Sequence, residues 1–177
     1  VGMRILYGIM NNMEGVWCER AFAPWGDMEE EMRSHHLPLW TLESHDPLEK
    51  FDVIAFSLGY EMAYSNVLNM LELGNIPLKS CDRGDSLKHL VIAGGTSVYN
   101  PEPMADFLDI CIEGEGEDVD VELLECYRSA KRRGLGRHAF LLEAAKIPGI
   151  YVPSLYEHTY NDDGTIREII PLEGAPK

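Results

Sequence analysis

Three short apolar runs along the middle of the chain constrain its fold more than any other feature. They show almost no polar alternation, and they are FDVIAFSL (51–58), HLVIAGG (89–95) and DICIEGE (109–115). Continuous apolar runs are typical of strands that are covered on both faces of a parallel sheet. The sequence therefore predicts a parallel sheet with helices on both sides.

Segments with helical patterns alternate with these runs. Met3, Leu6, Tyr7 and Met10 recur at helical spacing and predict a helix over 2–11. Further helices are predicted over residues 27–36 with Asp27 as the N-cap, 61–74, 101–108, 119–134 and 137–147. Strands that alternate with helices indicate a doubly wound, mostly parallel α/β sheet.

Extended segments precede and follow this alternating region. The short β-branched and aromatic stretch VWCERAF (16–22) predicts another strand. Residues 151–171 predict two strands around a turn at 161–164. The chain is therefore expected to form an α/β domain over 1–134, followed by a helix and a C-terminal β hairpin over 135–177.

Charge and cysteine content limit the classes of partner. The chain has 177 residues and a formal net charge of −15, so it repels phosphate backbones, and direct nucleic-acid binding is not expected. There is no apolar run long enough to span a membrane and no visible signal peptide, so no membrane partner is expected. The four cysteines lack CxxC and CxxxCxxC spacing, so neither an iron–sulfur cluster nor zinc is expected here, and a reducing cytoplasm suits them.

Glycines stand at the end of each of the three apolar runs, and the first two also have a hydroxyl residue there. The groups are Ser57-Leu58-Gly59 with Tyr60, Gly94-Gly95-Thr96, and Gly114-Glu115-Gly116. Because the carboxyl ends of parallel strands meet at one edge, these residues are expected to flank a common crevice, where such sheets bind ligands. Two interpretations stay open: the glycines form tight turns, or they let a large ligand approach the backbone.

Acidic residues distinguish the third group from a phosphate-binding loop. Glu115 and Glu117 suit the N-terminal end of a helix dipole, but they would repel a phosphate placed there. A nucleoside triphosphate site is therefore not expected. Tyr60 and Tyr64 share one face of the following helix, where packing and stacking on a ligand are both open.

Several blocks of the chain together resemble one known family. They are ERAFAPWGDMEEEM (19–32), FDVIAFSLGYEMAYSNVLNMLELGNIPL (51–78), VIAGGTSVYNPEPMADF (91–107), IEGEGE (112–117) and IPGIYVPSLYE (147–157). They look like the N-terminal cobalamin-binding-like domain of a largely uncharacterised family of radical S-adenosylmethionine (radical SAM) proteins. The resemblance implies a flavodoxin-like or Rossmann-like cobalamin-binding fold, with the residues at the three strand ends holding the cobalamin tail.

The chain departs from the family pattern in two ways. The family continues into a barrel with three cysteines for an iron–sulfur cluster and a site for S-adenosylmethionine, whereas this sequence has no such triad. It also lacks the DxHxxG motif that supplies a histidine to cobalt in methyltransferase-type cobalamin domains. The resemblance thus implies an accessory domain, not catalytic alone, that serves a downstream radical SAM barrel. A cofactor-free interaction domain, or a site for another nucleotide-like ligand, stays open.

The resemblance also places a strand and a loop before the helix at 2–11. The chain is therefore expected to begin inside its first βα unit, unless Met3 is the true start. Without that strand, residues 16–22 and 51–58 would lack a shared neighbour in the sheet. A final expectation is that a Gly95→Val substitution impairs ligand uptake more than folding, because a branched side chain crowds the crevice.

Overall fold

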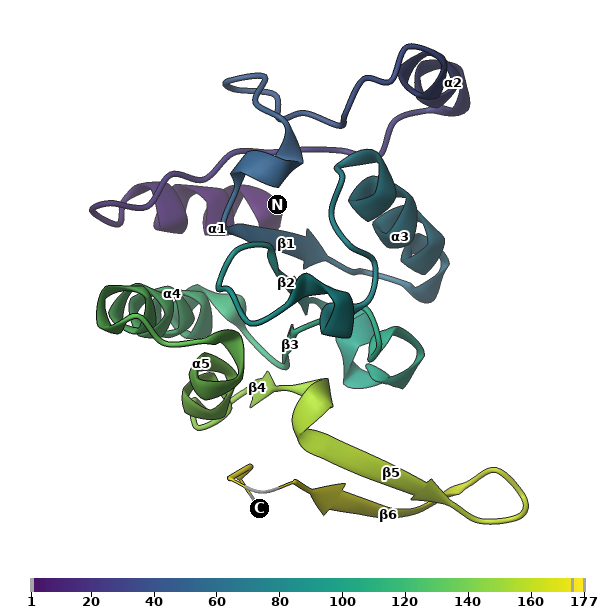
Figure 1. Ribbon diagram of the computed structural model, residues 1–177, viewed down its shortest axis with the longest axis vertical. Coiled ribbons are helices and arrows are strands. Elements are labelled where there is room, and N and C mark those ends of the chain that lie inside the picture. The colour runs from purple at the N-terminus through teal and green to yellow at the C-terminus, as the bar shows by residue number, and fades with distance from the viewer. Residues whose placement is uncertain (1, 173, 177) are drawn as a thin grey trace.

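The sheet at the centre of the molecule has four strands. The computed structural model describes residues 2–172 and 174–176. The strands lie in the order β1 (Val53–Ser57), β2 (Leu90–Gly94), β3 (Ile110–Ile112) and β4 (Ile150–Tyr151), as Figure 1 shows. The first three run parallel, whereas β4 pairs antiparallel with β3. The predicted mostly parallel α/β sheet is confirmed, with β4 as an unpredicted fourth strand.

Helices cover both faces of this sheet (Figure 1). The described helices are α1 (Gly2–Asn11), α2 (Gly26–Ser34), α3 (Tyr64–Leu73), α4 (Gly116–Arg133) and α5 (Arg137–Ala144). The helix predicted at 61–74 begins with a 3-10 turn over Glu61–Ala63, and the one predicted at 119–134 begins three residues earlier, at Gly116. None of the helices described is both long and apolar enough to cross a membrane.

Two hydrophobic clusters fill the space between the layers. On one face, Val67 and Leu71 of α3 pack with Val91 of β2. On the other face, Leu123 of α4 and Phe140 of α5 pack with strand residues that include Ile92 and Ile110. The alternate residues of β2 thus serve opposite layers, which is why this strand reads as a continuous apolar run.

A buried carboxylate connects the segments at the N-terminal ends of β2 and β3. Asp109 accepts hydrogen bonds from Arg83 Nη1 at 2.9 Å and from the Val91 amide at 2.7 Å. Arg137 Nη1 forms an ion pair with its other oxygen at 3.0 Å. Arg83 also donates to the carbonyls of Pro77 and Phe107. These contacts fasten the loop before β2 and the start of α5 to the sheet.

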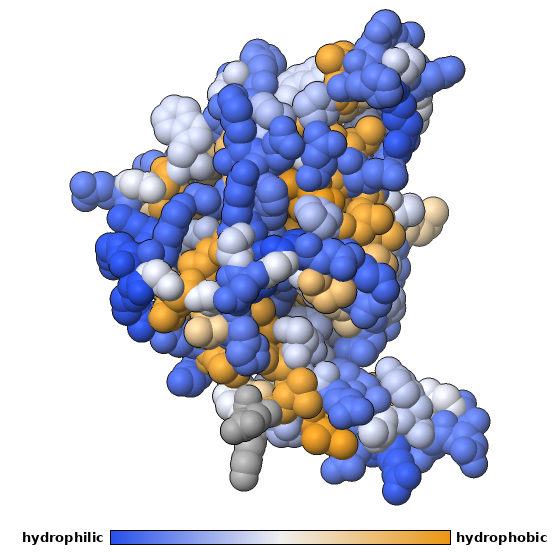
Figure 2. Space-filling view, in the orientation of Figure 1, coloured by the Kyte–Doolittle hydropathy of each residue, from blue (hydrophilic) through white to orange (hydrophobic). Residues whose placement is uncertain are grey.

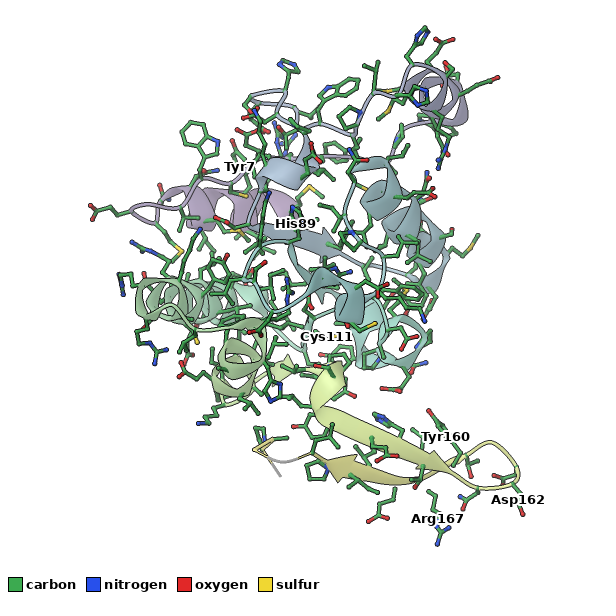
Figure 3. The ribbon with its side chains drawn as sticks, in the orientation of Figure 1. Tyr7, His89, Cys111, Tyr160, Asp162 and Arg167 are labelled. Carbon is green, nitrogen blue, oxygen red and sulfur yellow. The ribbon has the colours of Figure 1, made fainter. Side chains whose placement is uncertain are left out.

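The C-terminal hairpin forms a separate two-stranded sheet. Its strands are β5 (Tyr156–Tyr160) and β6 (Ile166–Pro171), and they join through the predicted turn at 161–164. Figure 3 shows Tyr160, Asp162 and Arg167 at the end of the hairpin that points away from the central sheet. Every residue of β6 is exposed.

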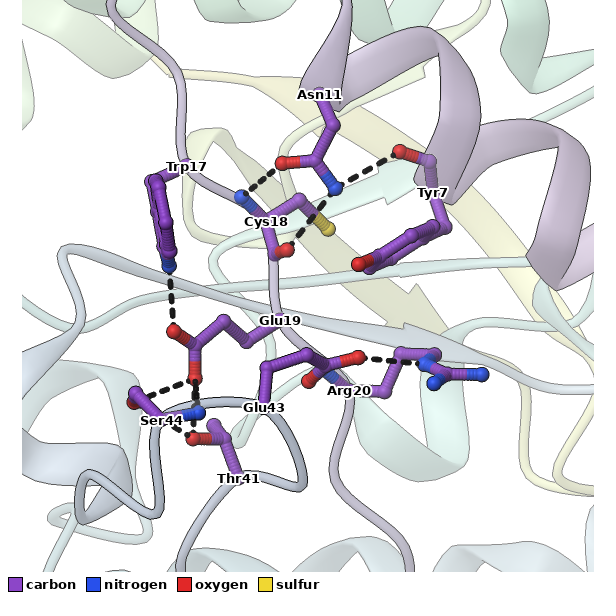
Figure 4. Close-up of polar contacts among 9 residues, drawn as sticks. All are labelled: Tyr7, Asn11, Trp17, Cys18, Glu19, Arg20, Thr41, Glu43 and Ser44. Carbon is purple, nitrogen blue, oxygen red and sulfur yellow. Dashed lines mark hydrogen bonds and ion pairs between the residues drawn. The ribbon is translucent and has the colours of Figure 1, made fainter.

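The strand predicted at 16–22 is wrong, because side chains and not a neighbouring strand bond the backbone of Cys18 and Arg20 (Figure 4). Asn11 accepts from the Cys18 amide and donates to its carbonyl, both at 3.0 Å. Glu43 accepts from the Arg20 amide at 2.8 Å and from its Nε at 2.7 Å. The stretch is therefore held in an extended form without a strand partner.

Three smaller predictions are also wrong. Residues 101–108 form only a short 3-10 turn over Glu102–Met104, since Pro101 and Pro103 each remove a backbone donor. Trp25 and not Asp27 is the N-cap of α2, and Asp27 accepts a hydrogen bond from the next amide instead. β1 is not covered on both faces, because Ala55 and Ser57, which point to the same face of the sheet, are exposed.

Candidate functional site

The three predicted strand ends meet at one edge of the sheet. Ser57 of β1 lies opposite Gly94 of β2, and Gly94 lies opposite Ile112 of β3. The loops that follow these residues therefore leave the sheet side by side, at its C-terminal edge. In open parallel sheets this edge is where ligands bind. We call these loops, residues 57–60, 94–97 and 113–116, the strand-end loops.

Hydrogen bonds join the first two strand-end loops into one unit. The Leu58 amide donates to the Gly94 carbonyl at 2.7 Å, and the Ser97 amide donates to the Leu58 carbonyl at 3.1 Å. Thr96 Oγ1 donates to the Gly59 carbonyl at 2.8 Å. The Leu58 side chain is buried in the core, and its backbone groups are used in these bonds. The buried Leu58 thus fixes the first two strand-end loops to each other and to the core.

Gly95 owes its identity to this packing. Its φ is +108°, and a Cβ atom there would lie 2.4 Å from the Leu58 carbonyl oxygen. No side chain fits at that distance from a backbone atom, so any larger residue forces the two loops apart. The expected order of effects for Gly95→Val is therefore reversed, because the substitution damages the fold first.

Two other glycines leave open space at the same edge. A Cβ atom built on Gly59 or Gly114 meets no atom within 4 Å. Tyr60, beside Gly59, has 60% of its surface exposed. Gly59 and Tyr60 thus offer backbone and an aromatic ring to a ligand without any contact that the fold itself needs, whereas Gly114 has a φ of +107°, which by itself favours glycine. Gly116 differs, since a Cβ there would lie 3.2 Å from Asp120 Oδ2 and 3.4 Å from Leu6 of α1.

The Ser97 hydroxyl is a feature that sequence reasoning missed. Ser97 is buried, and its Oγ has no hydrogen-bond partner among the described residues. Tyr64, which the sequence left open between packing and stacking, donates its hydroxyl to the Ser97 carbonyl at 3.1 Å. The only sequence signal for Ser97 was its place two residues after Gly95, next to Thr96. Buried hydroxyl groups are normally hydrogen-bonded, so an unpartnered one at a loop suggests a bound ligand or water.

Negative charge gathers at the third strand-end loop. Glu113 and Glu115 are exposed, and Glu117 lies in the first turn of α4. Burial, assisted by the nearby charge of Glu117, raises the pKa of Asp120 to about 6. This end of the crevice disfavours a phosphate group.

Histidines lie outside the strand-end loops. His89 precedes β2, where its Nε2 lies 2.8 Å from the Glu49 carbonyl, and Figure 3 places it apart from Cys111 of β3. His158 lies on β5, 3.4 Å from Glu102. Within residues 2–172 and 174–176, no three side chains of the types His, Cys, Asp and Glu are grouped as a metal ion requires.

Comparison with known proteins identifies the family. Residues 2–153 match the family described as radical SAM proteins, N-terminal. An uncharacterized protein of Methanocaldococcus jannaschii is 30% identical over 145 residues, which cover 81% of this chain. The match spans only 29% of that relative's own length. No solved structure matches the chain significantly. With most of its length matched, the chain belongs to the family of N-terminal domains of radical SAM proteins.

Proposed function

We propose that this domain binds cobalamin at the strand-end loops and presents it to a radical SAM catalytic domain of the same protein. The domain alone is not an enzyme in this proposal. The fold would then be a cobalamin-binding α/β fold of the flavodoxin-like or Rossmann-like kind. The iron–sulfur cluster and S-adenosylmethionine would belong to the catalytic domain, and the cytoplasm is the expected compartment.

One observation carries the proposal: the chain leaves two glycines open at the edge where three strands end. Gly59 and Gly114 face free space, although Gly95 between them is fully constrained by packing. A turn-only role explains Gly95 and also Gly114, whose φ is +107°, but it does not explain the open backbone at Gly59. Large planar ligands with a nucleotide tail need such a bare edge, because backbone approaches closely only where side chains are missing.

The residues present fit the tail of cobalamin, which carries one phosphodiester, better than a nucleoside triphosphate. Ser57, Thr96 and the unpartnered Ser97 hydroxyl supply polar groups beside the open glycines. Tyr60 offers an exposed ring. The carboxylates near Glu115 repel the several charges of a triphosphate at α4 more than the single charge of the phosphodiester in the cobalamin tail. When bound, cobalamin would supply a cobalt centre for methyl transfer or a related carbon-centred reaction.

The hairpin favours a second function, docking to another domain. β6 exposes Ile166, Ile169 and Ile170, and Leu172 beyond it is also exposed. Figure 2 shows apolar residues on the surface of this hairpin. A two-stranded hairpin is only marginally stable by itself, so it gains most from packing against a partner. A cofactor-free interaction domain would need this surface but not the open glycines.

A titration with hydroxocobalamin, followed by its absorption spectrum, tests the proposal. We expect saturable binding that Gly59→Trp weakens at least roughly tenfold, or by about 1.4 kcal/mol, because the indole occupies the open edge. The matched control is Ser86→Trp, an exposed position near the opposite end of β2, which should bind like the parent chain. Equal affinities for both variants would contradict a site at the strand-end loops, and no binding by the parent chain would favour the cofactor-free domain.

A further inference from the structure

A cavity of about 210 Å³ lies along the free edge of β1. Within the described part of the chain, β1 pairs with β2 alone. The opposite wall of the cavity includes Glu19, Ala21 and Ala23, which belong to no strand. In Figure 1 the purple stretch that follows α1 runs in the same direction as β1. The cavity thus separates two extended segments that have the same orientation.

The β1 wall presents unused backbone groups. Asp52 accepts from the Leu90 amide, and the Leu58 amide donates to Gly94, so even-numbered residues of this strand point toward β2. Backbone groups alternate along a strand, so Val53, Ala55 and Ser57 point toward the cavity. Outside the β1–β2 ladder, no hydrogen bond joins these three backbones to another described residue.

The opposite wall shows the same alternation. Cys18 and Arg20 use their backbone groups on Asn11, Glu43 and Leu42. The backbone groups of Glu19 and Ala21, between and after them, form no hydrogen bond within the described residues. Because neighbouring residues of an extended chain point to opposite sides, these groups face away from the partners of Cys18 and Arg20. Both walls therefore offer free donors and acceptors.

The helix α1 also lacks part of its packing. Its apolar residues recur on one side, yet none of its side chains is buried, and Met3 and Ile5 remain more than 40% exposed. α1 lies beside α4, with Leu6 next to Gly116 at the C-terminal edge of the sheet. Met3 itself lines the cavity. A helix of an α/β domain normally buries its apolar face on the strand that precedes it.

We propose that an additional apolar β-strand fills this cavity, parallel to β1 and joined to the N-terminal end of α1. It pairs with Val53, Ala55 and Ser57 on one side and with Glu19 and Ala21 on the other. Its carboxyl end then reaches the edge where α1 begins, as a short βα connection requires. Apolar side chains suit it, since the cavity is lined mainly by residues such as Ala21, Phe56 and Met70. The inference stands independently of cobalamin.

Amide hydrogen exchange tests this proposal residue by residue. In the 177-residue chain, the amides of Val53, Ala55 and Ser57 should exchange rapidly, whereas those of Ile54 and Phe56 in the β1–β2 ladder should be protected. The chain is then extended before α1 by a Val/Ile-rich strand and a short turn. We expect exchange at the three odd-numbered amides to slow roughly tenfold or more. An extension of equal length made of Gly and Ser is the matched control.

A proline at position 55 supplies a second readout. Its missing N–H points to the cavity, so Ala55→Pro should be tolerated in the unextended chain and should abolish the protection given by the apolar extension. If that variant does not fold, the comparison of the two extensions on the parent chain decides. Equal exchange with both extensions overturns the proposal. Protection of the odd-numbered amides in the unextended chain also overturns the proposal. If that protection rises with protein concentration, a second copy of the chain covers the edge of β1.

Discussion

The Gly95 backbone lies so close to the Leu58 carbonyl that a Cβ atom at position 95 would sit 2.4 Å from its oxygen. The two strand-end loops are thus packed backbone against backbone. We predict that Gly95→Ala lowers the free energy of unfolding by about 2–4 kcal/mol, from strain at positive φ and from the overlap. Urea denaturation measures it. Gly59→Ala is the control, and its effect should stay within about 0.5 kcal/mol.

The buried Asp109 carboxylate should be far more important for stability than any surface ion pair. Asp109→Ala leaves two buried guanidinium groups and the Val91 amide without their acceptor, so we expect a loss of about 3–5 kcal/mol. Asp52→Ala, which removes an exposed partner of Lys131, should cost under about 1 kcal/mol. Similar losses in the two variants would contradict a structural role for Asp109.

Asp120 should make stability depend on pH. Burial and Glu117 raise its pKa from 3.8 to about 6, so the folded state binds a proton more tightly than the unfolded state. This contribution is fully present below the unfolded pKa and is lost as the pH rises through about 6. Asp120→Asn should therefore stabilise the domain by about 2–3 kcal/mol at neutral pH, and by little near pH 4.

The pH series needs a carboxylate that differs only in burial. Glu122 lies on the same helix and is exposed. Glu122→Gln should shift stability by no more than about 0.5 kcal/mol at either pH. A pH-independent gain from Asp120→Asn would show that the carboxylate is not desolvated at the α1–α4 contact.

Bound cobalamin should carry no protein histidine on cobalt, because the six histidines of the chain lie outside the strand-end loops. The measurement is electron paramagnetic resonance of the reduced Co(II) state with natural and ¹⁵N-labelled protein. The spectra should be identical, since any axial nitrogen would come from the cofactor. A nitrogen splitting that changes with the protein label would identify a histidine ligand.

The three parallel strands and the meeting of their carboxyl ends were predictable from local pattern. Apolar runs at 51–58, 89–95 and 109–115 identify three strands, and parallel pairing then brings their glycine-rich ends together. β4 was not predicted, because a strand of two residues gives no periodic signal. The failure at 16–22 has another cause: Asn11 and Glu43 bond the backbone of Cys18 and Arg20 from distant positions, and propensity contains no such information.

The detailed roles of the glycines were beyond the sequence. Gly59, Gly95 and Gly114 cannot be told apart in the sequence, yet Gly95 is required by a carbonyl contact, Gly114 by a φ of +107°, and Gly59 by neither. The difference depends on how adjacent loops pack after the strands pair. The same holds for Ser97, whose isolation follows from burial and not from its neighbours in the chain.

Nuclear magnetic resonance of the ¹⁵N-labelled chain during a hydroxocobalamin titration tests the central claim most directly. If the cofactor lies over the strand-end loops, the amide resonances of Gly59, Gly95 and Gly114 shift together and saturate. The amides of Gly84 and His89, beyond the opposite end of the sheet, should remain unchanged. Shifts concentrated at Gly84 and His89, or no saturable shift at Gly59 and Gly114, would contradict a cobalamin site at this edge.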